Sequence, residues 1–115
     1  MRISLLPLMM MRLTLIALLM LPHSASAKTP LVEIHIKDHL YFPSEVIIPA
    51  ETKVKLLVVN DDDTAEEFES YELNREKIIM GGSKAVIFIG PLKPGRYPFF
   101  GEFYPKTAQG VIIAQ

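Results

Sequence analysis

The stretch PGRYPFFGEFYPKTAQGVIIA, from Pro94 to Ala114, decides the fold. A Pro-Gly turn leads into an aromatic segment, a short loop follows, and an apolar run from Gly110 to Ala114 closes the stretch. Two extended segments joined by a loop of this composition predict a β-hairpin. The chain contains no Cys. The hairpin therefore ends a β-rich domain that has no thiol.

Other strand-like segments precede this hairpin at short intervals. Val32, Ile34 and Ile36 alternate with polar residues, which is the period of a half-buried strand. The segment from Leu56 to Val59 is apolar throughout, which suits a strand covered on both sides. We expect about seven short strands in an antiparallel β-sandwich or barrel. The further segments expected to be extended are Glu45–Ile48, Glu66–Tyr71, Ala85–Ile89 and Tyr97–Phe100.

Two features between the strands are harder to assign. The residues from Asn60 to Thr64 have the composition of a turn, because Asn and Asp bond their own backbone. The segment from Leu73 to Met80 predicts either one helical turn or an irregular strand, ended by Gly81 and Gly82. Met80 itself is expected in the core.

The N-terminal residues have the pattern of a secretory leader. Basic residues precede an apolar run at positions 13–21, and Ala25-Ser26-Ala27 forms a small-residue cleavage site before Lys28. A membrane anchor is the alternative, but a spanning helix needs about 18 to 20 apolar residues. We therefore predict a cleaved leader, residues 1–27, and one exported domain, residues 28–115, with a periplasmic location.

Composition limits what the domain can do. Without the leader, 88 of the 115 residues remain, with ten basic and thirteen acidic side chains and a net charge of −3. This balance argues against a nucleic-acid partner. The lack of Cys excludes thiol redox catalysis and Cys-ligated zinc or iron–sulfur centres. No nucleophile-elbow or phosphate-loop pattern is present, so no catalytic residue is identified and an enzymatic role stays open.

The order of motifs resembles that of the cupredoxins. IKDHLYFPSEVIIPAETKVKLLVVN, residues 36–60, is similar to the opening half of that family, and NDDDTAEEFES is similar to the segment that delivers its first His ligand. The closing hairpin is similar to the copper-binding loop. The resemblance implies a Greek-key β-sandwich or barrel. It places Glu66, Gly101, Tyr104 and roughly Ala108 where copper ligands stand.

Within the cupredoxins, the chain is most similar to the EfeO-type proteins. EEFES, the run Arg75-Glu76-Lys77, PLKPGRY and GEFYPKTAQG carry this resemblance. These are small periplasmic relatives that lack the Cys ligand and are associated with bacterial iron uptake. In that subgroup the position of Tyr104 is commonly His. A type 1 copper site requires a thiolate, so the sequence predicts that none forms.

The substitutions replace soft ligands with oxygen donors. If a metal binds at the same end, the predicted ligands are Glu66, Glu67, Glu102 and Tyr104, and iron or copper is the expected ion. Carboxylates and phenols suit Fe(III), Mn(II) or Ca(II) better than Cu(I). The alternatives are glutamates that face water and a Tyr104 that packs as an aromatic. Asp61 to Asp63 would attract cations, and His39 is the one nearby imidazole to consider.

Two functions remain open from the sequence. The first is a component of a bacterial iron-uptake system, which binds or hands on iron, or assists ferrous oxidation. Its partners would be an inner-membrane iron permease and the other periplasmic components of that system. The second is a metal-free module that docks a protein partner through its acidic end.

Overall fold

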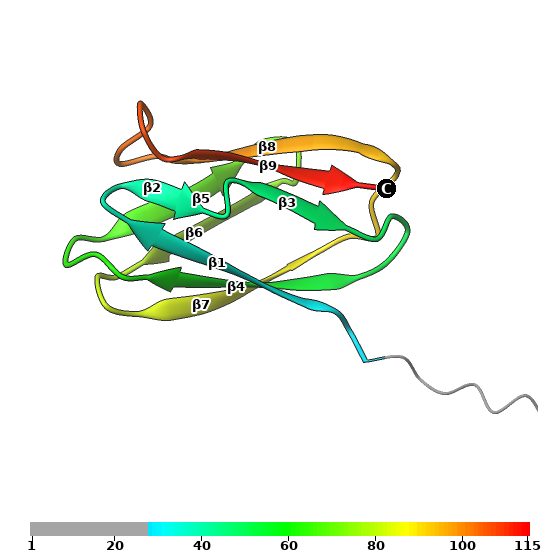
Figure 1. Cartoon of the computed structure of the whole chain (residues 1–115), viewed down its shortest axis with the longest axis horizontal. Coiled ribbons are helices and arrows are strands. Elements are labelled where there is room, and N and C mark those ends of the chain that lie inside the picture. The colour runs from blue at the N-terminus through cyan, green and yellow to red at the C-terminus, as the bar shows by residue number, and fades with distance from the viewer. Residues whose placement is uncertain (1–27) are drawn as a thin grey trace, which may run out of the picture.

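The computed structural model describes residues 28–115, which form two β-sheets packed face to face (Figure 1). This part of the chain has nine strands and no helix, so no helix capable of spanning a membrane lies within it. The strands are β1 (Leu31–Lys37), β2 (Leu40–Phe42), β3 (Glu45–Ile48), β4 (Val54–Asn60), β5 (Glu66–Ser70), β6 (Arg75–Ile79), β7 (Lys84–Ile89), β8 (Gly95–Gly101) and β9 (Gln109–Ala114).

The chain crosses repeatedly between the sheets. The four-stranded sheet has the order β2-β1-β4-β7, and the five-stranded sheet has the order β3-β9-β8-β5-β6. The predicted all-β sandwich is confirmed. The pairs β1–β4 and β3–β9 are parallel, which corrects the expectation of a purely antiparallel arrangement. Parallel pairing follows from topology, because β1 reaches β4 only by way of β3 in the other sheet.

Alternating apolar residues of both sheets meet between them in the core. Phe68 and Phe99 stack with centroids 5.1 Å apart, and Tyr41 meets Phe99 edge-on at 4.9 Å. The buried apolar residues are Ile34, Ile36, Tyr41, Val46, Ile48, Val54, Leu56, Val58, Phe68, Leu73, Ile79, Ile87, Ile89, Phe99, Ala108, Ile112 and Ala114.

Two expectations about burial need correction. Met80 is 62% exposed rather than in the core, because β6 ends at Ile79 and Met80 starts the next turn. Leu57 and Val59 are only half-buried, because nothing in the described structure covers the outer side of β4. Of the two alternatives for the segment from Leu73 to Met80, the strand is the one that forms, as β6, which pairs with β5.

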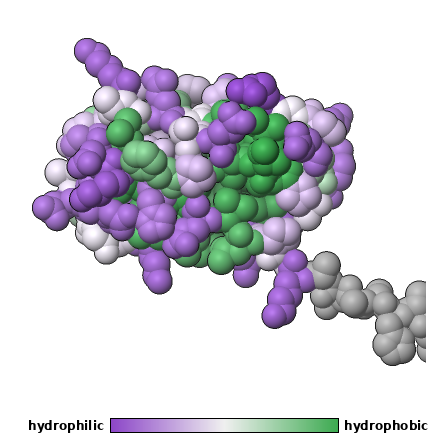
Figure 2. Space-filling view, in the orientation of Figure 1, coloured by the Kyte–Doolittle hydropathy of each residue, from purple (hydrophilic) through white to green (hydrophobic). Residues whose placement is uncertain are grey.

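Apolar side chains also gather on the surface. Figure 2 shows such an area over β3 and the strand beside it, and Ile47 on β3 is 58% exposed. A second set lies on the outer face of the four-stranded sheet, where Phe42 is 52% and Phe88 is 43% exposed. The surface of this small domain is therefore not uniformly polar.

Replacing Gly110 with Ala tests the packing between β9 and the core. A Cβ at this position would overlap the Phe99 ring, 2.5 Å from Cε2, and would lie 2.8 Å from the Ser44 carbonyl oxygen. We expect G110A to lower the free energy of unfolding by about 1–3 kcal/mol, measured by urea denaturation. G95A is the matched control, because its nearest neighbour would be 3.6 Å away. Equal effects of the two variants would contradict this packing.

Candidate functional site

Three connections meet at one end of the sandwich, which we call the loop end (Figure 1). They are the β1–β2 turn, the β4–β5 loop and the β8–β9 loop. The hydroxyl of Thr107, in the β8–β9 loop, donates to the His39 carbonyl at 2.7 Å. Asp62, in the β4–β5 loop, accepts the backbone N–H of the same His39 at 2.9 Å. These bonds fix the three connections relative to one another.

Glu66 brings a carboxylate into the interior of the loop end. The residue is 1% exposed and begins β5. Its Oε1 accepts the backbone N–H groups of Glu67 and Phe103, each at 2.9 Å. Its Oε2 is buried and has no hydrogen-bond partner within residues 28–115. Unpartnered buried oxygens are rare in folded proteins and costly, so this atom is a candidate ligand-binding group.

The carboxyl of Glu66 fills the space above Gly101. A Cβ at Gly101 would overlap Cδ of Glu66 and lie 2.5 Å from its Oε2. The same Cβ would lie 2.7 Å from the Cβ of Ala108, which is fully buried. The Gly101 N–H donates to the Ala108 carbonyl at 2.8 Å. Three positions where the resemblance expects copper ligands therefore pack directly on one another.

Tyr104 is half-buried and packs against the β1–β2 turn. Its ring stacks on that of His39 with centroids 3.5 Å apart and an angle of 14° between the planes. The Tyr104 carbonyl accepts the N–H groups of Ala108 and Thr107, which closes the loop as a turn. The packed-aromatic interpretation of Tyr104 thus describes its position, and His39 lies beside it.

The charge of Glu66 affects the pKa of a second tyrosine, Tyr41. Burial, and then the Glu66 carboxylate, raise the pKa of Tyr41. The Tyr41 hydroxyl donates to the Phe100 carbonyl over a long 3.4 Å. Tyr41 therefore stays a neutral phenol next to the loop end.

The run of three aspartates is mostly engaged within the fold. Asp62 accepts N–H groups from Asp38 and His39 at 2.7 and 2.9 Å. Partial burial opposes ionisation of Asp62, but these two backbone bonds outweigh it and lower its pKa. Asp61 contacts Nδ1 of His35 at 2.6 Å. That hydrogen bond is the main reason why the pKa of His35 is raised.

The four predicted metal ligands do not converge on one point. Glu66 points into the core, whereas Glu67 follows it in the strand and lies on the other face. Glu102 is exposed and is held to β5 only by its N–H, which donates to the Glu67 carbonyl at 2.9 Å. Tyr104 stacks on His39. A metal at these residues stays a prediction that would require the loop to shift.

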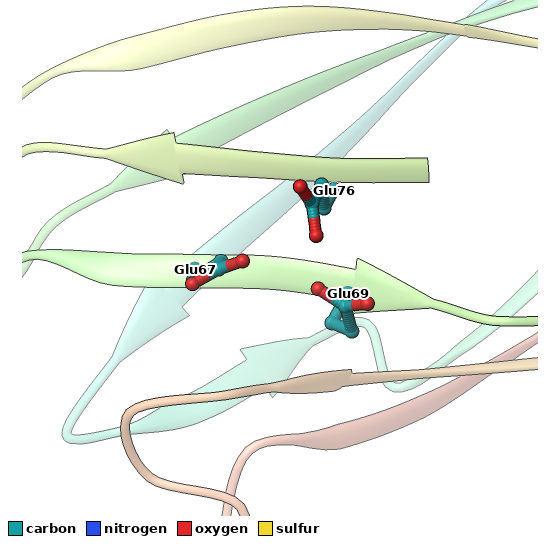
Figure 3. Close-up of side chains that lie close together, drawn as sticks. All are labelled: Glu67, Glu69 and Glu76. Carbon is teal, nitrogen blue, oxygen red and sulfur yellow. The ribbon is translucent and has the colours of Figure 1, made fainter. Parts of the chain in front are cut away.

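One group of three carboxylates does come together, on the outer face of β5 and β6. Oxygens of Glu67, Glu69 and Glu76 lie within 4.8 Å of one another. Figure 3 shows the three side chains gathered on β5 and β6. Burial, and then the charges of Glu76 and Glu67, raise the pKa of Glu69, which is 9% exposed. Only Glu67 belonged to the predicted set. The cluster was missed, although EEFES and REK flank a short turn that places Glu69 opposite Glu76.

The residues of the loop end do not fit a type 1 copper ion. The site needs a thiolate and two imidazoles. The chain has no Cys, and the resemblance to the cupredoxins puts Gly101, Glu66 and Tyr104 at those positions. The space of the thiolate is filled by a carboxylate. The remaining donors are oxygens, which prefer harder cations.

Comparisons with known proteins identify the family to which this fold is similar. The family model described as a cupredoxin-like domain matches residues 9–114. An uncharacterized protein of Rickettsia prowazekii (strain Madrid E) is 52% identical over 82 residues, which cover 71% of this chain. The match covers 66% of that relative, so this chain spans just under two thirds of its length.

Two solved structures share the fold at low sequence identity. Amicyanin from Paracoccus versutus is 17% identical with a TM-score of 0.60, over 79% of this chain and 87% of its own. The metal binding domain of the Cu(I) exporting P-type ATPase CopA from Streptococcus pneumoniae D39 is 16% identical with a TM-score of 0.64. That alignment covers 78% of this chain and 91% of the other. Both likenesses concern the fold alone.

A double-mutant cycle tests the contact between Glu66 and Gly101. We expect G101A to lower the free energy of unfolding by about 1–3 kcal/mol, because its Cβ displaces the carboxyl. In an E66A background the same change should cost less, with a coupling energy of about 0.5 kcal/mol or more by urea denaturation. The pair E66A and G95A serves as the additive control. Additivity of E66A and G101A would contradict the contact.

Proposed function

This chain belongs to the cupredoxin-like domain family, a fold related to copper-binding proteins, and on that premise we propose that it handles an iron ion as cargo. It acts in the periplasm as a component of a bacterial iron-uptake system. It receives iron, or copper in its place, on oxygen donors and passes it on beside an inner-membrane iron permease. It is not a blue-copper electron carrier.

The buried Oε2 of Glu66 is the observation that carries this proposal. A carboxylate oxygen without a partner in the interior loses its hydration and gains nothing in return. A multivalent cation compensates such a group directly. The oxygen lies at the end of the fold where the resemblance expects a metal, and oxygen donors favour hard ions.

Further oxygen donors lie in the β8–β9 loop, which is hydrogen-bonded to Glu66. The N–H of Phe103 donates to Glu66 Oε1, and Phe103 lies between Glu102 and Tyr104 in the chain. A small displacement of this loop turns the Glu102 carboxylate and the Tyr104 phenol toward Oε2. Binding is therefore coupled to a loop movement, which suits an ion that is delivered and released rather than kept.

Metal titration tests the proposal. Calorimetry of the mature protein with Fe(II) under anaerobic conditions, and separately with Cu(II), should show one bound ion. E66Q keeps the shape and the Phe103 bond but removes the charge, and we expect at least about tenfold weaker binding. E45Q is the matched control, because Glu45 is an exposed strand residue of β3. E102Q and Y104F should cause smaller losses.

The proposal fails if the wild type binds neither ion, or if E66Q binds as tightly as E45Q. Retained folding of E66Q is checked by its urea midpoint. A loss of binding by E45Q would show that the ion sits elsewhere on the acidic surface.

A second function, docking a protein partner without metal, is favoured by the tip of the loop end. Phe103 is 45% exposed and borders a shallow pocket of about 360 Å³. The pocket is lined by His39, Phe103, Tyr104, Pro105, Lys106 and Thr107. The aspartates of the β4–β5 loop lie at the same end. An apolar centre beside acidic residues fits a partner with a basic, partly apolar surface.

A photocrosslinker in place of Phe103 tests this second function in the periplasm. We expect one crosslinked partner whose yield falls at high salt and in D63K, because exposed charge attraction is screened or reversed. E66Q should leave the yield unchanged, which separates docking from metal handling. A crosslinker at Glu45 is the positional control. No salt-sensitive product, or equal products at both positions, would count against docking.

A further inference from the structure

The outer face of the four-stranded sheet is uncovered and largely apolar. Side chains of β1, β2 and β7 that point outward include five large hydrophobic residues, each at least 40% exposed. These are Leu31, Leu40, Phe42, Val86 and Phe88. Contiguous exposed apolar area on a small domain usually marks an interaction surface.

Strand register brings one end of this face together as a row. Leu31 lies opposite Lys55, and Lys55 lies opposite Phe88, so three strands contribute neighbouring side chains. In the next row, Leu57 lies opposite Val86. Leu31 is 59% exposed and Val86 is 48% exposed. The row thus combines apolar side chains with a lysine in its centre.

Two lysines converge on the exposed ring of Phe88. The Lys53 and Lys55 ammonium groups lie 4.9 and 5.6 Å from its centroid. Arg75 adds a third cation nearby, because its Nε donates to the Phe88 carbonyl at 2.9 Å. Among the described residues, every ion pair within 4.0 Å involves a His, so these cations have no carboxylate partner.

One acid, Glu33, shares this outer face, where it lies opposite Leu57 in the row next to Lys55. Glu33 is the outward-facing acid of β1, and its Oε1 contacts Nε2 of His35 at 3.4 Å. The carboxylates of Glu67, Glu69 and Glu76 lie together on the outer face of the other sheet, on β5 and β6 (Figure 3). The cluster of three carboxylates and the two lysines therefore lie on the outer faces of different sheets.

The start of the described chain lies beside the row formed by Leu31, Lys55 and Phe88. The Pro30 carbonyl accepts the N–H of Lys55 at 2.9 Å. The described chain therefore enters the fold beside β4 (Figure 1). The residues before Lys28 include the apolar run at positions 13–21. Cleavage before Lys28 would add a positive α-amino group here.

We propose that this surface, which we call the cationic face (Leu31, Lys53, Lys55, Val86 and Phe88), docks the protein on an anionic phospholipid surface. The lysines engage the phosphate headgroups, and their stems lie along the apolar residues. Phe88 and Leu31 enter the boundary between headgroups and acyl chains. An acidic protein surface would leave these two side chains against polar groups. The cationic face shares no residue with the Glu66 site, so it stands independently of metal handling.

Vesicle binding tests the proposal with the mature protein. We expect cosedimentation with vesicles of phosphatidylglycerol and phosphatidylcholine, and little with phosphatidylcholine alone. K53E/K55E should bind at least about tenfold more weakly, because each basic residue near an anionic surface contributes measurably. K77E/K106E changes the net charge equally but lies on β6 and the β8–β9 loop, and it should bind nearly as the wild type does.

A fluorescent variant reports insertion directly. The sequence contains no Trp, so F88W introduces a single tryptophan, which can be excited apart from the tyrosines, without changing the charge. Its emission should shift to the blue on anionic vesicles, and lipids brominated on their acyl chains should quench it. If the charge-reversal variant K53E/K55E unfolds, the milder K53Q/K55Q replaces it. We expect K53Q/K55Q to lose part of the vesicle binding.

Three results would overturn the proposal. One is no preference for anionic vesicles, and another is an equal loss of binding in K77E/K106E and K53E/K55E, which would reflect net charge alone. The third is anionic binding by F88W without a blue shift or quenching, which would place the contact on another surface. Capture of an acidic protein by the cationic face in the absence of vesicle binding would assign the face to that protein.

Discussion

A carboxyl group packed against a glycine organises the functional end of this domain. Glu66 occupies the volume that any side chain at Gly101 would require, and this close approach brings the start of β5 against the end of β8. The same carboxyl holds the N–H of Phe103. The β8–β9 loop is thereby fastened, and Tyr104 reaches the ring of His39. The contacts of Glu66 thus join β5, the end of β8 and the β8–β9 loop.

This arrangement changes how the loss of the copper ligands should be understood. Removing a metal from a cupredoxin-like site would ordinarily leave a hollow lined by its former ligands. In this chain the replaced positions fill that hollow, because Glu66, Gly101 and Ala108 pack on one another. The aromatic core of Phe68, Phe99 and Tyr41 lies beneath and does not depend on a metal. The fold can therefore be stable while its loop end serves another purpose.

Sequence reasoning succeeded where the signal is local and failed where it is not. The alternation of Ile34 and Ile36 predicted a strand with one buried face, since a period of two needs only neighbouring residues. The parallel β1–β4 pairing depends on a crossover, which no local pattern encodes. Met80 was misplaced because hydrophobicity alone says nothing of where a strand ends.

The candidate sites divide in the same way. The resemblance located Glu66 at the loop end, but the unpartnered Oε2 and its packing on Gly101 appear only in three dimensions. The Glu69–Glu76 contact follows from the register of a short hairpin, so a symmetric placement of acids around a turn could have revealed it. The convergence of Lys53 and Lys55 on Phe88 joins residues more than 30 positions apart, and it required the β4–β7 pairing.

The geometry of the strands finally relates the two proposed surfaces. β1 runs from Leu31, in the cationic face, to Lys37, which adjoins the turn at the loop end. Seven residues of extended chain cover roughly 20 Å at about 3.3 Å each. A domain docked through its cationic face therefore holds Glu66 and the β8–β9 loop away from the lipid contact. Cargo or a membrane partner can reach the loop end from the side, because docking uses the opposite end of the same strand.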